Sequence, residues 1–156
     1  MDLEIWAPSK ISWISPLAHR LIRLVELSGS VPGEEADVEL ALLEAISNAV
    51  VHGNQSDERK QFHVKCRCAK GVGVSIVVSD EGQGFDPTMI PEAVSIECER
   101  GRGIALMKFY MDRVSFKKEG TEVHMWKASR RKPRTAPACS QPMHRAEEEI
   151  RSAPVP

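Results

Sequence analysis

Apolar and polar residues alternate in three early stretches of the chain, as they do in half-buried strands. Leu3, Ile5 and Ala7 form the first such stretch. The second and third cover residues 62–68 and 72–78, and only a short Lys70-Gly71 break separates them. A short connection with glycine between two alternating runs predicts a β-hairpin.

A second group of segments carries apolar residues at helical spacing. Residues 17–28 place leucine and valine on one helical face, and Ser15-Pro16 predicts the start of that helix because proline is tolerated at the first helical position. A second helix is expected from about Glu35 to Val51, with an acidic first turn that suits the helix dipole and a stop at Gly53-Asn54. A third is expected from Ile104 to Met111.

The last two expected strands contain Val114 with Phe116 and Val123 with Met125, on either side of a Glu119-Gly120 turn. Elements in this order predict an α+β fold: a two-layer α/β sandwich in which a mixed, mostly antiparallel sheet carries helices on one face. No strict βαβ repeat occurs, which argues against a doubly wound fold.

Composition changes at Ser129, where basic residues and then scattered prolines replace the apolar periodicity. We therefore expect one domain over residues 1–128 and a disordered tail over residues 129–156. The apolar fraction of 42% and the charged fraction of 28% are ordinary for a globular domain.

Charge and hydropathy exclude several classes of partner. The net charge of −1 gives no electrostatic case for direct nucleic-acid binding. No apolar run approaches the roughly 20 residues that span a bilayer, and the acidic start Met1-Asp2-Leu3-Glu4 does not resemble a signal peptide. These features predict a cytoplasmic protein that does not bind a membrane. Cys66 and Cys68 share one face of an expected strand and are interpreted as small core residues rather than metal ligands.

The candidate chemistry begins in the second helix, where Glu44 and Asn48 are four residues apart and share one face, which His52 continues. An amide oxygen suits Mg²⁺, which prefers hard oxygen ligands and keeps several waters or phosphates. A carboxylate one turn away can accept a proton from a hydroxyl or water that attacks a phosphate. An isolated pair of this kind is more often a solvated polar stripe, but small residues around it leave room for a ligand.

Asp80 ends an apolar strand and is followed by two spaced glycines, Gly82 and Gly84. An ionised carboxylate accepts hydrogen bonds only, so the exocyclic amine of adenine is a suitable donor. The glycines allow close backbone approach or a positive φ. A plain turn after a strand is the alternative interpretation.

Gly101-Arg102-Gly103 stands immediately before the third expected helix. Backbone N–H groups at a helix start can bind phosphate oxygens, and the Arg100 and Arg102 side chains can pair with phosphate. The segment is not a Walker loop, because no Gly-Lys-Ser/Thr sequence follows.

Taken together and in this order, the three segments resemble the GHKL (Bergerat-fold) ATPase superfamily, and within it the bacterial anti-sigma factor serine/threonine kinases. The resemblance covers roughly residues 1–127. The N box of the family is matched by Glu44…Asn48…His52-Gly53, and its G1 box by Asp80…Gly82…Gly84-Phe85-Asp86-Pro87. The G2 box is matched by Gly101-x-Gly103, and the last and weakest box by Gly120-Thr121.

This resemblance implies ATP and Mg²⁺ as cofactors, with Glu44 as general base, Asn48 on the metal and Asp80 on adenine. His52, Gly82, Gly84, Gly101, Arg102, Gly103 and Thr121 are the further nucleotide-binding residues that it implies. It also implies phosphorylation of a serine on a STAS-type anti-anti-sigma partner, binding of a sigma factor, and a homodimer.

Two other functions compete with a kinase. An ATP-responsive anti-sigma or adaptor module would bind the nucleotide without significant phosphotransfer. The catalytic domain of a histidine kinase is disfavoured, because the 34 residues before the second helix are too few for a dimerising helix pair with its phosphoacceptor histidine. A non-nucleotide α+β domain with chance matches is the least favoured alternative.

Overall fold

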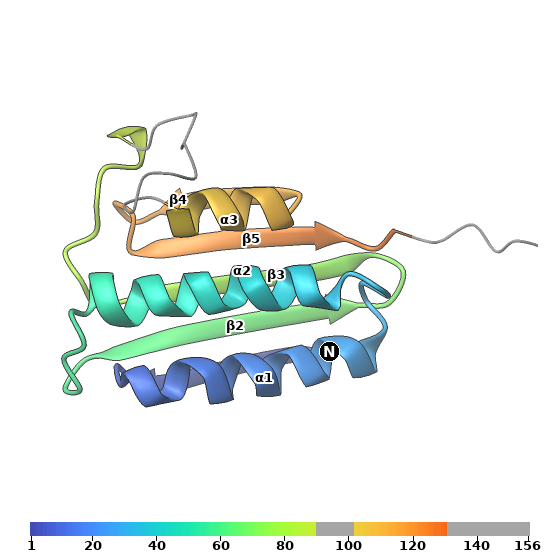
Figure 1. Ribbon diagram of the computed structural model, residues 1–156, viewed down its shortest axis with the longest axis horizontal. Coiled ribbons are helices and arrows are strands. Elements are labelled where there is room, and N and C mark those ends of the chain that lie inside the picture. The colour runs from blue at the N-terminus through green and yellow to red at the C-terminus, as the bar shows by residue number, and fades with distance from the viewer. Residues whose placement is uncertain (90–101, 131–156) are drawn as a thin grey trace, which may run out of the picture.

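A five-stranded sheet carries α-helices on one of its faces in the computed structural model, which describes residues 1–89 and 102–130 (Figure 1). The strands are β1 (Asp2–Pro8), β2 (Gln61–Ala69), β3 (Gly73–Asp80), β4 (Arg113–Lys117) and β5 (Glu122–Ala128). The helices are α1 (Ile11–Ser28), α2 (Glu35–Ser47) and α3 (Arg102–Tyr110), with a π-helical turn η1 (Asn48–Gly53) and a 3-10 turn η2 (Pro87–Met89).

The strands are ordered β1-β2-β3-β5-β4, and each neighbouring pair is antiparallel. The predicted α+β sandwich with helices on one face is therefore confirmed, and within the described residues its sheet has no parallel pairing. The predicted β2–β3 hairpin is also confirmed, with Val64 opposite Val78 and Cys66 opposite Ile76.

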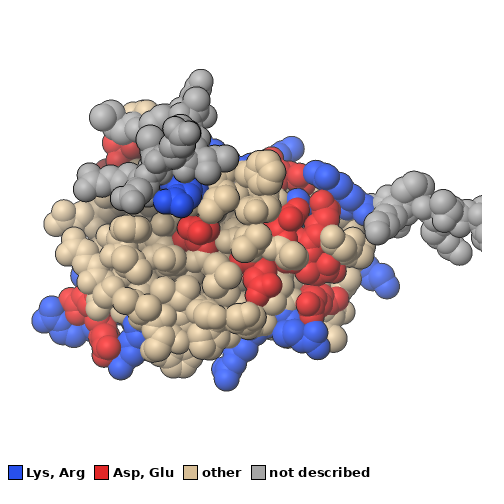
Figure 2. Space-filling view, in the orientation of Figure 1, with Lys and Arg blue, Asp and Glu red and all other residues tan. Residues whose placement is uncertain are grey.

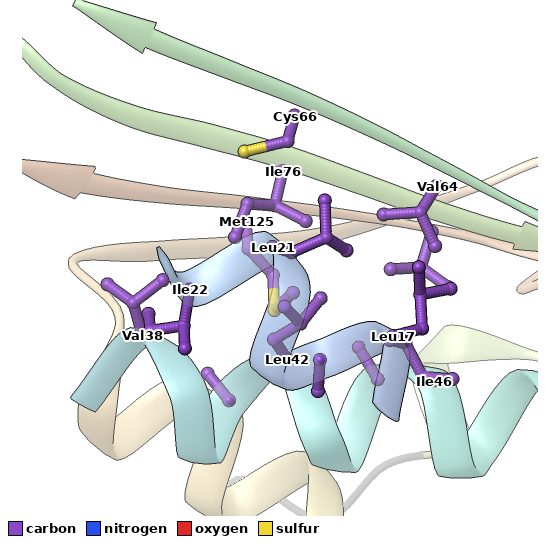
Figure 3. Close-up of a cluster of buried hydrophobic side chains, with 14 of the residues drawn as sticks. Leu17, Leu21, Ile22, Val38, Leu42, Ile46, Val64, Cys66, Ile76 and Met125 are labelled. Atoms are coloured by element: carbon purple, nitrogen blue, oxygen red, sulfur yellow. The ribbon is translucent and has the colours of Figure 1, made fainter. Parts of the chain in front are cut away.

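The core lies between the helix layer and one face of the sheet. Figure 3 shows Leu21 of α1 and Leu42 of α2 in a cluster with Ile76 and Met125 of the sheet, and all four are at most 1% exposed. Alternate residues of β2 point into this layer, as the sequence pattern predicts for a strand with one buried face. Cys66 and Cys68 are buried, unpaired members of this row, so their interpretation as core residues holds.

The start predicted for the first helix was wrong. α1 begins at Ile11, so Pro16 lies inside the helix rather than at its first position. Proline at that place removes one backbone hydrogen bond near an exposed end of the helix, where water can satisfy the freed carbonyl. The apolar face of Leu17, Leu21 and Val25 is buried as predicted, and this burial outweighs the local cost of the proline.

The end of the second helix also differs from the prediction. Regular α-helix stops at Ser47, and the chain then widens into η1, in which the N–H of Asn54 donates to the carbonyl of Ala49 at 2.8 Å. A bond across five residues defines a π-turn, and such turns occur often at functional sites. The polar residues that follow Glu44 therefore lie partly on a wider helix than the sequence pattern assumes.

A buried lysine ties the helix layer to the sheet at the opposite end from η1. Lys127 of β5 is 4% exposed; its Nζ lies 3.0 Å from Asp37 Oδ2 and 3.3 Å from Glu34 Oε1, and it donates to the carbonyl of Tyr110 at 2.7 Å. Figure 2 shows the acidic side chains gathered at this end of the helical face. Because a buried cation is costly without partners, these contacts fix the start of α2 against β5 and the end of α3.

β5 ends at Ala128, immediately before the boundary predicted between the domain and its tail. Most of that tail, residues 131–156, lies outside the described residues, as do residues 90–101 with the predicted phosphate-binding Gly101 and Arg100. Among the helices of the described ranges, none combines the length and the apolar character needed to cross a bilayer.

We expect Leu42→Ala to lower the free energy of unfolding by about 2–5 kcal/mol, because it removes a fully buried side chain and leaves a cavity. Leu40→Ala, on the same helix but 44% exposed, is the matched control and should change stability by less than about 0.5 kcal/mol. Urea unfolding followed by circular dichroism measures both, and equal losses for the two variants would contradict the packing described here.

Candidate functional site

A cleft of about 1100 Å³ opens between α2 with η1, the end of β3, the start of α3 and the β4–β5 turn. The sequence places these elements far apart, and the fold brings them together at one end of the helix layer. Eight of the predicted site residues line the cleft: Glu44, Asn48, His52, Asp80, Gly84, Arg102, Gly103 and Thr121. Gly82 contacts Asp80 just behind the wall, and Gly101 is outside the described residues.

Glu44 and Asn48 form the wall that α2 and η1 contribute. Both are partly exposed, as groups that contact a ligand must be. α3 begins directly against them: a Cβ built on Gly103 would lie 2.6 Å from Glu44 Oε2 and 3.5 Å from both terminal atoms of the Asn48 amide. Gly103 therefore leaves the Glu44 carboxylate in its present position, and a side chain there would require the end of Glu44 to move.

The donor set around Asn48 fits a hard cation only in part. Within residues 1–89 and 102–130, no group of three or more His, Cys, Asp or Glu side chains is placed to hold a metal ion. One amide oxygen is a weak site by itself, whereas Mg²⁺ at nucleotide sites characteristically takes one or two protein ligands together with phosphates and waters. The cleft thus fits Mg²⁺ that arrives with a nucleotide.

Asp80 stands at the opposite wall, at the last position of β3. Its backbone N–H donates to the carbonyl of Thr121 at 3.0 Å, and its Oδ1 accepts from the N–H of Gly82 at 2.8 Å. Burial raises the pKa of the Asp80 carboxyl, while the Gly82 bond and the charge of Lys60 act in the other direction. A half-buried carboxylate with one oxygen engaged can accept a hydrogen bond from a ligand through the other.

Two glycines make room for this carboxylate. A Cβ on Gly53 would lie 2.5 Å from Asp80 Oδ1, and a Cβ on Gly82 would lie 2.7 Å from the same atom. Both distances are shorter than a side chain tolerates, so the Asp80 carboxylate occupies a cradle that only glycine leaves open. The sequence analysis predicted such a close approach for Gly82, whereas it gave Gly53 the role of a helix stop and a place in the N-box resemblance, with no contact to Asp80.

The loop after Asp80 is fastened to the β4–β5 turn. The N–H of Phe85 donates to the carbonyl of Glu119 at 2.7 Å, and Gly84 and Gly120 take φ values of +72° and +85°. The Phe85 ring packs edge-on against Phe116, with ring centroids 5.2 Å apart. Gly84 thus adopts a positive φ, one of the two reasons that the sequence analysis gave for glycine at this position. Thr121, which belongs to the same turn, lines the cleft.

Sequence reasoning missed Gln55 and Phe116, which also line the cleft. Phe116 appeared only as an alternating strand residue, and its place in the cleft depends on which strands are neighbours. Gln55 adopts φ +57°, a left-handed conformation that is uncommon outside glycine. The preceding Gly53-Asn54 stop was the only signal that the chain turns sharply there.

The raised pKa of Asp80 predicts how stability without nucleotide depends on pH. The folded protein retains this proton above the ordinary pKa of 3.8, so the contribution of the group to stability falls as pH rises from that value through the raised pKa. Asp80→Asn has no such proton to lose. Its free energy of unfolding relative to wild type should therefore increase through this window and then level off, as measured by urea unfolding at a series of pH values. A relative decrease would show that the fold favours the ionised carboxylate.

Comparison with known proteins agrees with this arrangement. The family described as "Histidine kinase-like ATPase domain" matches residues 8–127. The chain is 33% identical over 104 residues to the anti-sigma F factor of Clostridium perfringens (strain SM101 / Type A). This alignment covers 60% of this chain and 72% of the relative. It is 25% identical over 135 residues to the serine-protein kinase RsbW of Staphylococcus epidermidis, covering 80% and 85% of the two chains.

A solved structure supports the fold. The crystal structure of the RsbU and RsbW domains of a Mycobacterium tuberculosis protein superimposes with a TM-score of 0.57 at 17% sequence identity. The match covers 83% of this chain and 32% of that longer one, so it concerns the fold of one of its parts. With the family match spanning all elements from the end of β1 to β5, the chain belongs to the histidine kinase-like ATPase domain family, in its anti-sigma factor kinase branch.

Proposed function

We propose that this protein is an ATP-binding anti-sigma regulatory factor that phosphorylates a serine or threonine of an anti-anti-sigma partner. The observation that carries the proposal is the convergence of Glu44, Asn48 and Asp80 on one cleft that the first turn of α3 also lines. The names of the Clostridium and Staphylococcus relatives supply the regulatory context.

In this proposal the two walls of the cleft bind different parts of the nucleotide. Asp80 accepts a hydrogen bond from the exocyclic amine of adenine, and the Gly53–Gly82 cradle holds the carboxylate in place for it. At the other wall, the amide oxygen of Asn48 is the protein ligand of Mg²⁺, and Arg102 with the start of α3 faces the phosphates. Bound MgATP supplies the transferable phosphoryl group and the positive charge that stabilises its transfer.

Glu44 is the group that receives a proton. It accepts the hydroxyl proton of the partner's serine while the serine oxygen forms its bond to the γ-phosphorus and the bond to the β,γ-bridging oxygen breaks, which leaves ADP. Glu44 lies one helical turn from Asn48, so the proton acceptor would lie beside a metal ion held by the Asn48 amide oxygen. A sigma factor would be the second partner, and we further propose that the protein acts as a homodimer.

Replacing Asp80 tests whether its carboxylate binds adenine. Asp80→Asn presents a donor where adenine also presents one, and a buried polar group left unpaired costs about 1–3 kcal/mol, so ATP affinity should fall about ten-fold or more. Isothermal titration calorimetry with MgATP measures the change. Equal affinities for the variant and wild type would remove Asp80 from the adenine site.

Replacing Glu44 and Asn48 separates catalysis from binding. Glu44→Ala should leave MgATP affinity near that of wild type but lower phosphotransfer by about 10²–10⁴, the usual effect of losing a general base. Asn48→Ala should in addition weaken Mg²⁺-dependent ATP binding, because a metal ligand is lost. Transfer of radiolabelled phosphate from ATP to purified anti-anti-sigma candidates of the same genome measures the rates.

The same assay decides between the kinase and the binding module. If wild type transfers no phosphate to any partner that it binds, yet ATP changes the affinity of the complex, the protein is an ATP-responsive adaptor. If Glu44→Ala transfers phosphate at the wild-type rate, a different residue accepts the proton.

A further inference from the structure

Asn54, immediately after η1, is a fully buried polar residue outside every motif described above, at 0% exposure. Its Nδ2 donates to Ser9 Oγ at 2.7 Å and to the carbonyl of Gln61 at 2.8 Å, and its Oδ1 accepts from the N–H of Glu81 at 2.8 Å. Burying an amide costs free energy unless such bonds are made. A side chain with both donor protons and its acceptor engaged is therefore held in one orientation.

Two of the partners of Asn54 belong to segments that form opposite walls of the cleft: Ala49 lies in η1, and Glu81 directly follows β3. The backbone N–H of Asn54 closes the π-turn through the carbonyl of Ala49, one residue beyond Asn48. Its side-chain oxygen holds the peptide that directly follows Asp80. One residue thus connects the helix that carries Asn48 to the strand end that carries Asp80.

The bond to Glu81 controls the direction of the Asp80 side chain. Peptide groups are planar, so the two planes that flank a Cα atom together fix the direction of its Cα–Cβ bond. The plane before Asp80 is fixed by the sheet, because the Asp80 N–H donates to the carbonyl of Thr121. The plane after it leaves the sheet, and its N–H, that of Glu81, bonds to Asn54 Oδ1.

Little space remains for Asp80 to adopt another position. The carboxylate lies in the cradle of Gly53 and Gly82, where an added Cβ would come within 2.5 Å and 2.7 Å of Oδ1. A rotation of the peptide after Asp80 would move Gly82 as well, since the Gly82 N–H donates to Asp80 Oδ1. The orientation set at Glu81 is therefore transmitted to both the carboxylate and its cradle.

We propose that Asn54 is a positioning residue for adenine recognition: through the N–H of Glu81 it sets the Asp80 carboxylate at the exocyclic amine of the base. The inference rests on the proposed function, because it takes Asp80 as the adenine acceptor. It goes beyond that function in assigning the preference for adenine to a residue that does not line the cleft.

The test compares two nucleotides that differ only in the amine. MgATP and the triphosphate of purine riboside, which lacks the exocyclic amine, are titrated into wild type, Asn54→Ala and Ser9→Ala by calorimetry. Ser9→Ala is the matched control: it removes a partner of the same buried amide but leaves the bond to Glu81. Thermal unfolding is followed for each variant, so that preference and stability are measured separately.

Wild type should prefer ATP about ten-fold or more, as expected for one hydrogen bond to a charged acceptor. Asn54→Ala should lose most of this preference, chiefly through weaker ATP binding, whereas Ser9→Ala should keep it within about three-fold even if its thermal stability falls. A folded Asn54→Ala that retains the wild-type preference would overturn the proposal. Absence of ATP binding by wild type would instead refute the proposed function itself.

Asn54→Asp keeps the test decisive if Asn54→Ala does not fold. It preserves the shape and the oxygen that accepts from Glu81, while it loses both donor protons. Its added charge acts alike on the two triphosphates, and titration at a pH well above the raised pKa of Asp80 keeps that carboxylate ionised, so the charge cancels in the ratio of affinities. Retention of the ATP preference by Asn54→Asp supports the acceptor role, and its loss in a folded variant overturns that role.

Discussion

The structure depends on the burial of one face of the sheet beneath its helices. Alternate side chains of β2, β3 and β5 point into the helix layer, and each large one contributes roughly 1.5–3 kcal/mol when it is removed from water. Because the pleat gives a strict period of two, a shift of one residue in the pairing would expose the whole row. The register that places Val64 opposite Val78 is therefore strongly determined, and with it the position of Asp80 at the end of β3.

The cleft follows from where this packed layer ends. α2 buries one face in the core through to its last turn, and beside that buried face Glu44 and Asn48 remain partly exposed. β3 ends at the opposite wall, where the β4–β5 turn adjoins it through the Phe85–Glu119 bond. At the far end the Lys127 ion pairs hold α2 and the end of α3 against β5. One end of the helix layer is thus fastened by charge, and the other is open to a ligand.

Elements with a clear period could be predicted from the sequence, and elements set by local exceptions could not. The alternation at residues 62–68 and 72–78 predicted the central hairpin, and the spacing of Glu44 and Asn48 placed both on the wall of the cleft. The start of α1 was missed because Pro16 resembled a first helical residue, whereas the helix begins at Ile11 with a largely exposed first turn. Asn54 gave no signal beyond a helix stop, since its partners at Ser9 and Glu81 are 45 and 27 residues away in sequence.

The π-turn at Asn48–Gly53 affects how this chain is compared with others. A π-turn is equivalent to one residue inserted into an α-helix, so the residues after it are rotated by roughly a quarter of a turn relative to an uninterrupted helix. A relative whose helix continues without widening can therefore be aligned without a gap and still present a different residue to the cleft at the position of His52. For this helix, equivalent residues of homologues are better identified by superimposing the backbones than by aligning the sequences.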